Sequence, residues 1–159
     1  MQRCVLSLIG SIVILLTACG KSPTSSACND TDPAKDSTTL LFFAKTHGIG
    51  PLKDTLGLYY QVIAQGSGAT PASNSTIFVT YTGTLMDSTV FDSQSDASKT
   101  GFSLGSLIPG WQIGLPKIQV GGHIKLLIPS KYGYGCVGSG ASIPPNSPIF
   151  FDITLVSIQ

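Results

Sequence analysis

Residues 108–128 read Ile-Pro-Gly-Trp-Gln-Ile-Gly-Leu-Pro-Lys-Ile-Gln-Val-Gly-Gly-His-Ile-Lys-Leu-Leu-Ile, and we expect the rest of the chain to be organised around this stretch. It contains Trp111, the only tryptophan of the 159-residue chain. A lone tryptophan among isoleucine, leucine and glycine is expected in the core or at the floor of an apolar pocket, where its large ring area is buried. Which of these two places it takes is the functional question.

The first half of this stretch predicts a short helix that begins near Pro109. Trp111, Leu115 and Ile118 are spaced by four and three residues, which places them on one helical face. A proline inside a helix removes the hydrogen bond to the preceding turn, so we expect the helix to end or kink at Pro116.

Strand patterns surround the predicted helix. Four segments are rich in β-branched and aromatic side chains or alternate apolar with polar residues, namely residues 58–65, 76–85, 123–128 and 149–158. Tyr81 falls on the apolar side of its strand, and His123 falls on the outward side of its own. Gly83 indicates a bulge or a place where another group approaches the backbone.

A further helix is predicted before these strands. Asp32 can cap it, Pro33 suits its first position, and apolar residues recur at helical spacing from Leu40 until Gly48 stops it. At least four strands with one short central helix predict an α+β domain with an antiparallel sheet. We place the N-terminal helix and its linker in residues 32–57 and the main domain in residues 58–159.

The N-terminus has the pattern of an export signal. A basic start is followed by an apolar run from Val5 to Leu16, which is shorter than the roughly 20 residues that span a bilayer. The residues before Cys19 resemble a bacterial lipobox, which implies a signal peptide over residues 1–18 and a lipidated Cys19. Residues 19–31 are then a flexible tether. An ordinary signal peptide or a short anchor is the alternative.

The charge balance limits the kinds of binding partner, and the cysteine content bears on the cellular compartment. The chain has nine lysine and arginine residues against eight acidic ones, with no basic cluster, which argues against nucleic acid. With Cys4 in the signal and Cys19 lipidated, Cys28 and Cys136 remain in an exported, oxidising compartment. They form either one disulfide bridge or two free thiols.

Most of the residue patterns that support catalysis are absent from the sequence. The chain has no glutamate and two isolated histidines, and its Gly-Ser-Gly turns lack the lysine of a phosphate-binding loop. Two cysteines and two distant histidines do not form a zinc set. We therefore expect neither hydrolysis, phosphoryl transfer nor metal catalysis, and no cofactor. The remaining candidates for a functional site are aromatic and apolar side chains.

Seven motifs follow one another along the chain: Val79-Thr-Tyr-Thr-Gly-Thr-Leu85, Val90-Phe-Asp-Ser93, Phe102-Ser-Leu-Gly105, Leu107-Ile-Pro-Gly-Trp-Gln-Ile-Gly-Leu115, Ile128-Pro-Ser-Lys-Tyr-Gly-Tyr-Gly135, Ile143-Pro-Pro-Asn146 and Ile149-Phe-Phe-Asp-Ile-Thr-Leu155. In this order and spacing they resemble the FKBP-type peptidyl-prolyl cis-trans isomerases. The resemblance runs from about residue 58 to the C-terminus. It implies a twisted antiparallel sheet of five to six strands wrapped around one short helix, with a proline pocket between them.

The resemblance also implies a role for each pocket residue. Trp111 becomes the floor of the pocket. The catalytic walls are Tyr81, Phe91, Ile108 and Phe151, and the substrate-binding residues are Phe102, Leu107 and Ile143, the last of these on a flap above. Asp92 and Tyr134 are polar groups at the rim. Lys99 is a candidate partner for Asp92.

The implied activity is isomerisation of X-Pro peptide bonds in exported, proline-containing polypeptides, without a cofactor or metal. The alternatives are a proline-binding or chaperone-like module with little turnover, and a structural or adhesive envelope lipoprotein. We expect a monomer held by its lipid anchor in the bacterial cell envelope, at the inner or the outer membrane, with weakened binding of macrolide inhibitors.

Overall fold

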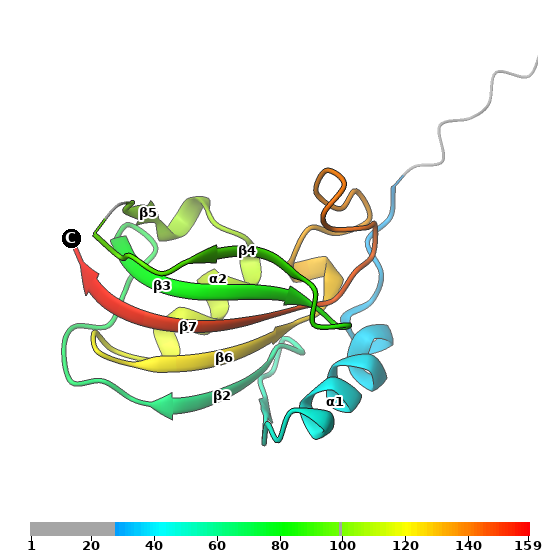
Figure 1. Ribbon diagram of the computed structural model, residues 1–159, viewed down its shortest axis with the longest axis horizontal. Coiled ribbons are helices and arrows are strands. Elements are labelled where there is room, and N and C mark those ends of the chain that lie inside the picture. The colour runs from blue at the N-terminus through cyan, green and yellow to red at the C-terminus, as the bar shows by residue number, and fades with distance from the viewer. Residues whose placement is uncertain (1–27, 99) are drawn as a thin grey trace, which may run out of the picture.

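The computed structural model describes residues 28–98 and 100–159 (Figure 1). The predicted signal peptide, the lipidation site Cys19, most of the tether and Lys99 lie outside the described residues. No helix within the described ranges is long and apolar enough to cross a membrane.

One antiparallel sheet of seven strands forms the body of the described chain, in the order β1-β2-β6-β7-β3-β4, with β5 also paired to β3. The strands are β1 (Leu52–Lys53), β2 (Tyr59–Ala64), β3 (Thr76–Leu85), β4 (Val90–Gln94), β5 (Phe102–Ser103), β6 (His123–Ile128) and β7 (Ile149–Ile158). The helices are α1 (Ser37–Thr46) and α2 (Pro109–Gly114), and the 3-10 turns are η1 (Pro33–Asp36), η2 (Leu104–Ser106), η3 (Leu115–Lys117) and η4 (Ser130–Tyr132).

The strand count differs from the five to six expected from the sequence. The two shortest strands, β1 and β5, have two residues each and pair with the ends of β2 and β3. A two-residue strand is too short to show alternation, so only the tertiary pairing reveals it. β1 also means that the region expected to be a linker contributes to the sheet.

The two longest strands, β3 and β7, pair along most of their length, from Ile77 opposite Ile158 to Leu85 opposite Ile149. Alternation along β7 buries four side chains on its inner face, Ile149, Phe151, Ile153 and Leu155. This face and α2 enclose the main core.

The short helix α2 packs closely on the inner face of β6 and lies behind the sheet in Figure 1. A Cβ atom at Gly110 would lie 2.6 Å from the side chain of Ile128, and one at Gly114 would lie 2.6 Å from that of Leu126. Glycine at both positions therefore lets the helix approach the strand. The helix gives way to η3 at Leu115, as expected from Pro116.

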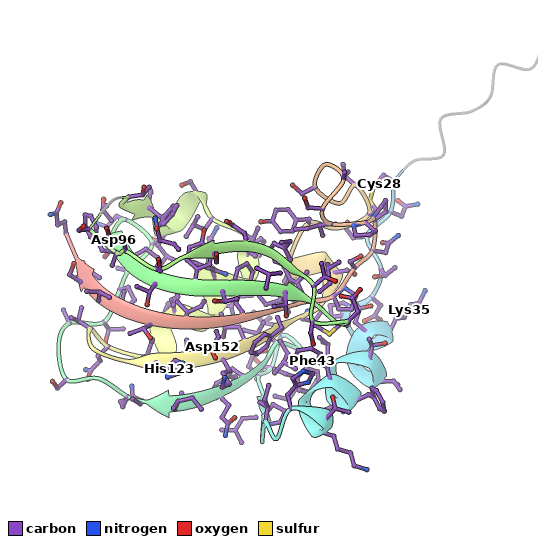
Figure 2. All side chains as sticks on the ribbon, viewed as in Figure 1. Cys28, Lys35, Phe43, Asp96, His123 and Asp152 are labelled. Atoms are coloured by element: carbon purple, nitrogen blue, oxygen red, sulfur yellow. A yellow bond between two sulfur atoms is a disulfide. The ribbon has the colours of Figure 1, made fainter. Side chains whose placement is uncertain are left out.

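Helix α1 packs on the opposite, outer face of the sheet. Leu40 and Phe43 belong to a second buried cluster with Leu127 and Phe150, and Figure 2 shows Phe43 pointing toward the sheet. Leu127 and Phe150 alternate with Leu126 and Phe151 of the main core, so the two helices cover opposite faces.

The start of α1 differs slightly from the expected single helix. The Asp32 side chain accepts a hydrogen bond from the backbone N–H of Ala34 at 2.9 Å, and Pro33 takes the first position, as expected. The first turn is 3-10, and the α-helix begins at Ser37. Asp36 accepts bonds from both the backbone N–H and the hydroxyl of Ser130, each at 2.7 Å, which ties this first turn to the loop after β6.

Cys28 and Cys136 are joined in a disulfide, with their Cα atoms 5.6 Å apart. Asp30 lies beside it and accepts a hydrogen bond from the backbone N–H of Cys136 at 3.0 Å. The bridge joins residues 108 positions apart, so it closes most of the domain into one loop. A loop of this length strongly restricts the unfolded chain.

Reduction of this disulfide is expected to lower the free energy of unfolding of the mature protein by roughly 2–5 kcal/mol. Urea unfolding with and without dithiothreitol measures the loss. The Cys28→Ser/Cys136→Ser variant is the control, because the reductant should leave its midpoint unchanged. Two titratable thiols in the unreduced, denatured protein would contradict the bridge.

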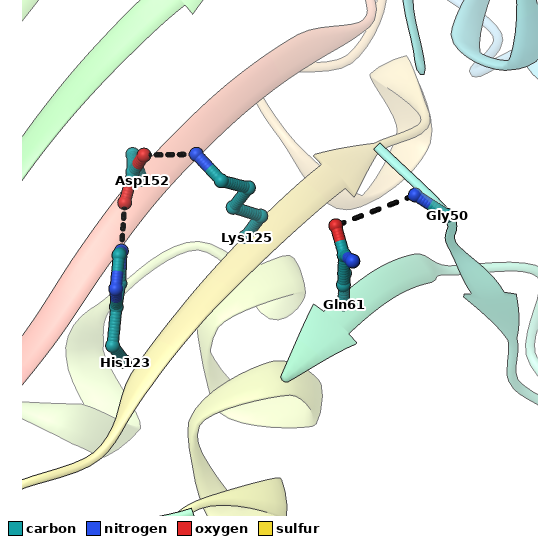
Figure 3. Close-up of polar contacts among 5 residues, drawn as sticks. All are labelled: Gly50, Gln61, His123, Lys125 and Asp152. Carbon is teal, nitrogen blue, oxygen red and sulfur yellow. Dashed lines mark hydrogen bonds and ion pairs between the residues drawn. The ribbon is translucent and has the colours of Figure 1, made fainter. Parts of the chain in front are cut away.

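A charged cluster lies on the outer face of the sheet. Asp152 of β7 forms an ion pair with Lys125 and a hydrogen bond with His123, both of β6, and Figure 3 shows its carboxylate between them. Burial favours a higher pKa for Asp152, but the hydrogen bonds and charges of Lys125 and His123 outweigh it and lower the pKa. His123 thus faces outward, as expected. Asp152 joins β7 to β6 through its contacts with His123 and Lys125.

This cluster predicts a pH-dependent stability. Because the pKa of Asp152 is lowered on folding, its contribution is complete above pH about 4 and is lost as the pH falls through the lowered value. Asp152→Asn should therefore cost about 1 kcal/mol at pH 7 and much less near pH 2.

Urea unfolding of the wild type, Asp152→Asn, Lys125→Met and the double variant at both pH values tests this cluster. A coupling energy at pH 7 that vanishes near pH 2 is expected. Equal differences between wild type and Asp152→Asn at both pH values would show that the ion pairs do not stabilise the fold.

Candidate active site

A small cavity of about 120 Å³ opens between α2 and the inner face of the sheet. Ligand pockets for drug-sized molecules are roughly 300–1,000 Å³, so this cavity suits one small ring or side chain. Strands β3, β4, β5 and β7, helix α2 and two loops contribute its lining, which consists of Tyr81, Asp92, Phe102, Leu107, Ile108, Trp111, Tyr134 and Phe151.

Trp111 lies deep in this cavity and keeps only 4% of its surface exposed. Its ring meets the edges of Tyr81 at 5.2 Å and of Phe151 at 5.1 Å between ring centroids, at interplanar angles of 84° and 87°. Edge-to-face contacts of this kind fix the orientation of a ring. Its indole nitrogen has no hydrogen-bond partner within the described residues. Trp111 therefore belongs to the core and to the cavity at once.

Phe151 connects the aromatic side chains of the site. Its ring contacts Tyr81 at 5.9 Å and Phe91 at 5.5 Å in addition to Trp111. These rings cross β3 at Gly83, where a Cβ atom would lie 2.6 Å from Phe151 and 2.8 Å from Phe91. The register between β3 and β4 also shifts next to Gly83, so both features expected of this glycine are present.

Two tyrosine hydroxyls lie at the cavity with different partners. The Tyr81 hydroxyl donates to the carboxylate of Asp92 at 2.8 Å. The Tyr134 hydroxyl bonds to no group of the described chain. Burial and the charge of Asp92 raise the pKa of both tyrosines, and the hydrogen bond raises that of Tyr81 further, so both hydroxyls keep their protons at neutral pH. Tyr134 is left as an open donor.

A second open donor is the backbone N–H of Ile108, which bonds to no acceptor in the parts of the chain described. Ile108 precedes α2 as its N-terminal cap residue. The amide of Gln112, one turn into the helix, donates to the carbonyl of Leu107 at 2.7 Å and to that of Gly105 at 3.2 Å. The sequence analysis did not identify Gln112 as a site residue. Its position as the one polar side chain within α2 could have indicated that it bonds to a neighbouring segment.

Two expected site residues do not line the cavity. Phe91 lies behind Phe151 and Tyr134, with its ring 6.5 Å from that of Tyr134, and lines a separate groove with Ser142. Ile143 is buried in the main core, and its backbone pairs with Ser139. Phe91 therefore packs against the lining residues Phe151 and Tyr134 from outside the cavity, and Ile143 belongs to the core.

The lining contains no serine, cysteine, histidine or lysine, and its one carboxylate, Asp92, accepts the hydrogen bond of Tyr81. Within the described ranges, no three His, Cys, Asp or Glu side chains gather as metal ligands. A larger, shallow depression of about 740 Å³ lies on the outer face of the sheet and is lined mainly by hydroxyl and charged groups. The aromatic cavity is therefore the candidate site: a small, mainly apolar space whose lining includes two open hydrogen-bond donors, the N–H of Ile108 and the hydroxyl of Tyr134.

Comparison with known proteins agrees with this class of site. Residues 68–156 match the family model described as FKBP-type peptidyl-prolyl cis-trans isomerase. The FKBP-type peptidyl-prolyl cis-trans isomerase FkpA of Escherichia coli is 42% identical over 118 residues, which cover 74% of this chain and 43% of FkpA. The outer membrane protein MIP of Legionella longbeachae is 39% identical over 65% of this chain and 45% of its own.

Solved structures agree as well. The peptidyl-prolyl cis-trans isomerase of Pseudomonas syringae superposes with a TM-score of 0.68 at 29% identity, covering 82% of this chain and 98% of that one. The family match spans more than half of the chain, so the chain belongs to the FKBP-type peptidyl-prolyl cis-trans isomerase family. The matched region is less than half the length of the curated FkpA and MIP proteins.

Gly83→Ala tests the close approach of the rings to β3. The added methyl group must displace Phe151 and Phe91, which is expected to cost about 1–3 kcal/mol of stability. Thr82→Ala is the control, because Thr82 is exposed on the same strand and should change stability by less than about 0.5 kcal/mol. Urea unfolding followed by Trp111 emission measures both. Equal stabilities would show that the rings have room to move.

Proposed function

We propose that this chain is a peptidyl-prolyl cis-trans isomerase that accelerates rotation about X-Pro bonds by binding the proline ring in the aromatic cavity. The observation that carries the proposal is the cavity itself. Its size suits a single ring, Trp111 lies deep within it, and two donors beside it have no partner in the described chain.

The chemistry of the X-Pro bond suits a site whose lining has no serine, cysteine, histidine or lysine. Rotation about a peptide bond meets a barrier of roughly 18–20 kcal/mol because the amide loses its resonance halfway. The twisted amide has a less dipolar carbonyl, so an apolar cavity disfavours the planar ground state more than the twisted state. Binding that favours the transition state in this way accelerates the reaction.

The open donors then act on the backbone around the proline. The N–H of Ile108 and the hydroxyl of Tyr134 are proposed to hold carbonyls that flank the rotating bond, while Trp111 holds the ring. Gln112 is proposed as a positioning residue, since it fixes the carbonyls of Leu107 and Gly105 beside Ile108. The Tyr81–Asp92 hydrogen bond keeps the opposite wall in place.

Location and further partners are proposed from the sequence and the relatives. One relative carries the name outer membrane protein MIP, which supports an envelope location. The lipobox-like sequence before Cys19 supports a lipid anchor, with exported polypeptides as substrates. We propose a monomer in which macrolide inhibitors bind weakly.

Tyr134→Phe is expected to lower kcat/KM about 3- to 10-fold, because it removes one hydrogen bond made in the transition state. The measurement is protease-coupled isomerisation of an X-Pro peptide by the chain without residues 1–19. Tyr132→Phe is the matched control in the same loop, because the Tyr132 hydroxyl bonds to the carbonyl of Leu56, away from the cavity, and its loss should leave the rate unchanged.

The same assay separates the rival functions. Absence of acceleration by the wild type, with a proline peptide still quenching Trp111 fluorescence, would identify a proline-binding module instead of an enzyme. Absence of both signals would favour a structural envelope lipoprotein. Equal rates for Tyr134→Phe and wild type would remove Tyr134 from the mechanism.

A further inference from the structure

Helix α1 carries an apolar and basic surface on the side that faces away from the sheet. Its buried side chains, Leu40, Phe43 and Ala44, leave an opposite side formed by Thr38, Leu41, Phe42 and Lys45, with Lys35 one turn earlier. We call these five residues the outer face of α1. Phe42 is 69% exposed and Leu41 is 45% exposed, so two neighbouring large apolar side chains of the same helix face solvent.

The charge of this face is positive. Lys35 and Lys45 form no ion pair with any described residue. The nearby carboxylates are engaged with the protein itself, because Asp32 caps the first turn and Asp36 binds Ser130. Two lysines beside an exposed phenylalanine and leucine form the pattern of a helix that lies in a membrane interface, where lysine meets anionic headgroups.

The described chain begins at Cys28, which the disulfide fastens to the body of the domain. A fully extended chain advances at most about 3.5 Å per residue, so residues 20–27 hold Cys19 within roughly 30 Å of Cys28. Figure 2 shows Cys28 and Lys35 at the same end of the molecule, with the Lys35 side chain pointing away from it.

We propose that the outer face of α1 lies on the anionic phospholipid bilayer into which the acyl chains of Cys19 insert. The proposal rests on the lipid anchor given under the proposed function but not on the isomerase activity. Phe42 and Leu41 enter the headgroup region, and the two lysines bind phosphate groups.

This contact gives the anchored domain a defined orientation. Helix α1 covers the outer face of the sheet, whereas Trp111 and the cavity lie on the inner face. A bilayer against α1 therefore leaves the cavity on the side of the sheet turned away from the lipid, where polypeptides can enter it. A lipid tether alone would leave the domain free to rotate.

The experiment uses the mature, lipidated protein in vesicles of phosphatidylcholine and phosphatidylglycerol, with and without bromine on the acyl chains. Bromine quenches a tryptophan that enters the bilayer. Phe42→Trp is the reporter, and Val156→Trp is its control at the C-terminal end of β7, where Val156 is 45% exposed. The added emission of Phe42→Trp should fall about twofold or more, because an interfacial helix buries its apolar face roughly 5–10 Å into the boundary region. Val156→Trp and wild type should be unchanged.

Adding Lys35→Gln and Lys45→Gln to the reporter tests the charges. Quenching should rise with the phosphatidylglycerol fraction in Phe42→Trp and should lose this dependence in the triple variant. Quenching of Phe42→Trp no greater than that of Val156→Trp, in protein with an acylated Cys19 by mass spectrometry, would overturn the proposal and leave the anchor intact.

Two further outcomes would also overturn it. An emission change that depends on the protein-to-lipid ratio would show that a second copy of the chain covers the outer face of α1. If mass spectrometry shows that the mature protein carries no acyl chain, and this protein does not bind vesicles, both the lipid anchor and the membrane contact of α1 would be rejected. The isomerase rate, measured on each variant in parallel, tells whether the proposed activity stands independently.

Discussion

The close contact between α2 and β6 is the constraint on which the site depends. Gly110 and Gly114 face Ile128 and Leu126, and a methyl group at either glycine would collide with those side chains at 2.6 Å. Only this approach places the first turn of α2 deep enough for Trp111 to reach both the core and the cavity. The termination of the helix after Gly114 then leaves Leu115 buried in the core beneath it.

A second close approach shapes the other side of the cavity. The β3–β7 pairing brings Tyr81 and Phe151 onto one face, and Gly83 leaves space for Phe151 and Phe91 above the strand. The rings of these three aromatic residues and of Trp111 hold one another by edge-to-face contacts. The walls are therefore rigid, and their rigidity comes from apolar contacts. Rigid apolar walls with an open donor at Ile108 and another at Tyr134 suit a reaction that needs positioning and desolvation but no bond making.

The two faces of the sheet serve different purposes. The inner face builds the cavity, and the outer face carries the Asp152 ion pairs and helix α1, whose exposed side is proposed to meet the bilayer. Because side chains alternate along β6 and β7, one pair of strands supplies both faces. The disulfide and the bonds of Asp30 and Asp36 fasten the N-terminal segment to the same body, so the entry of the tether is fixed relative to the cavity.

Local chemistry was enough to predict the long strand over residues 76–85, the end of the central helix near Pro116 and the inventory of aromatic residues, because alternation, proline geometry and residue type are properties of neighbouring positions. It was not enough to tell lining residues from supporting ones. Phe91 and Ile143 lie behind the cavity, and Gln112 turned out to hold the loop before α2. These placements, like the short strands β1 and β5, depend on contacts between segments far apart in the chain, and only the packed tertiary structure decides which side of a ring faces the cavity and which faces the core.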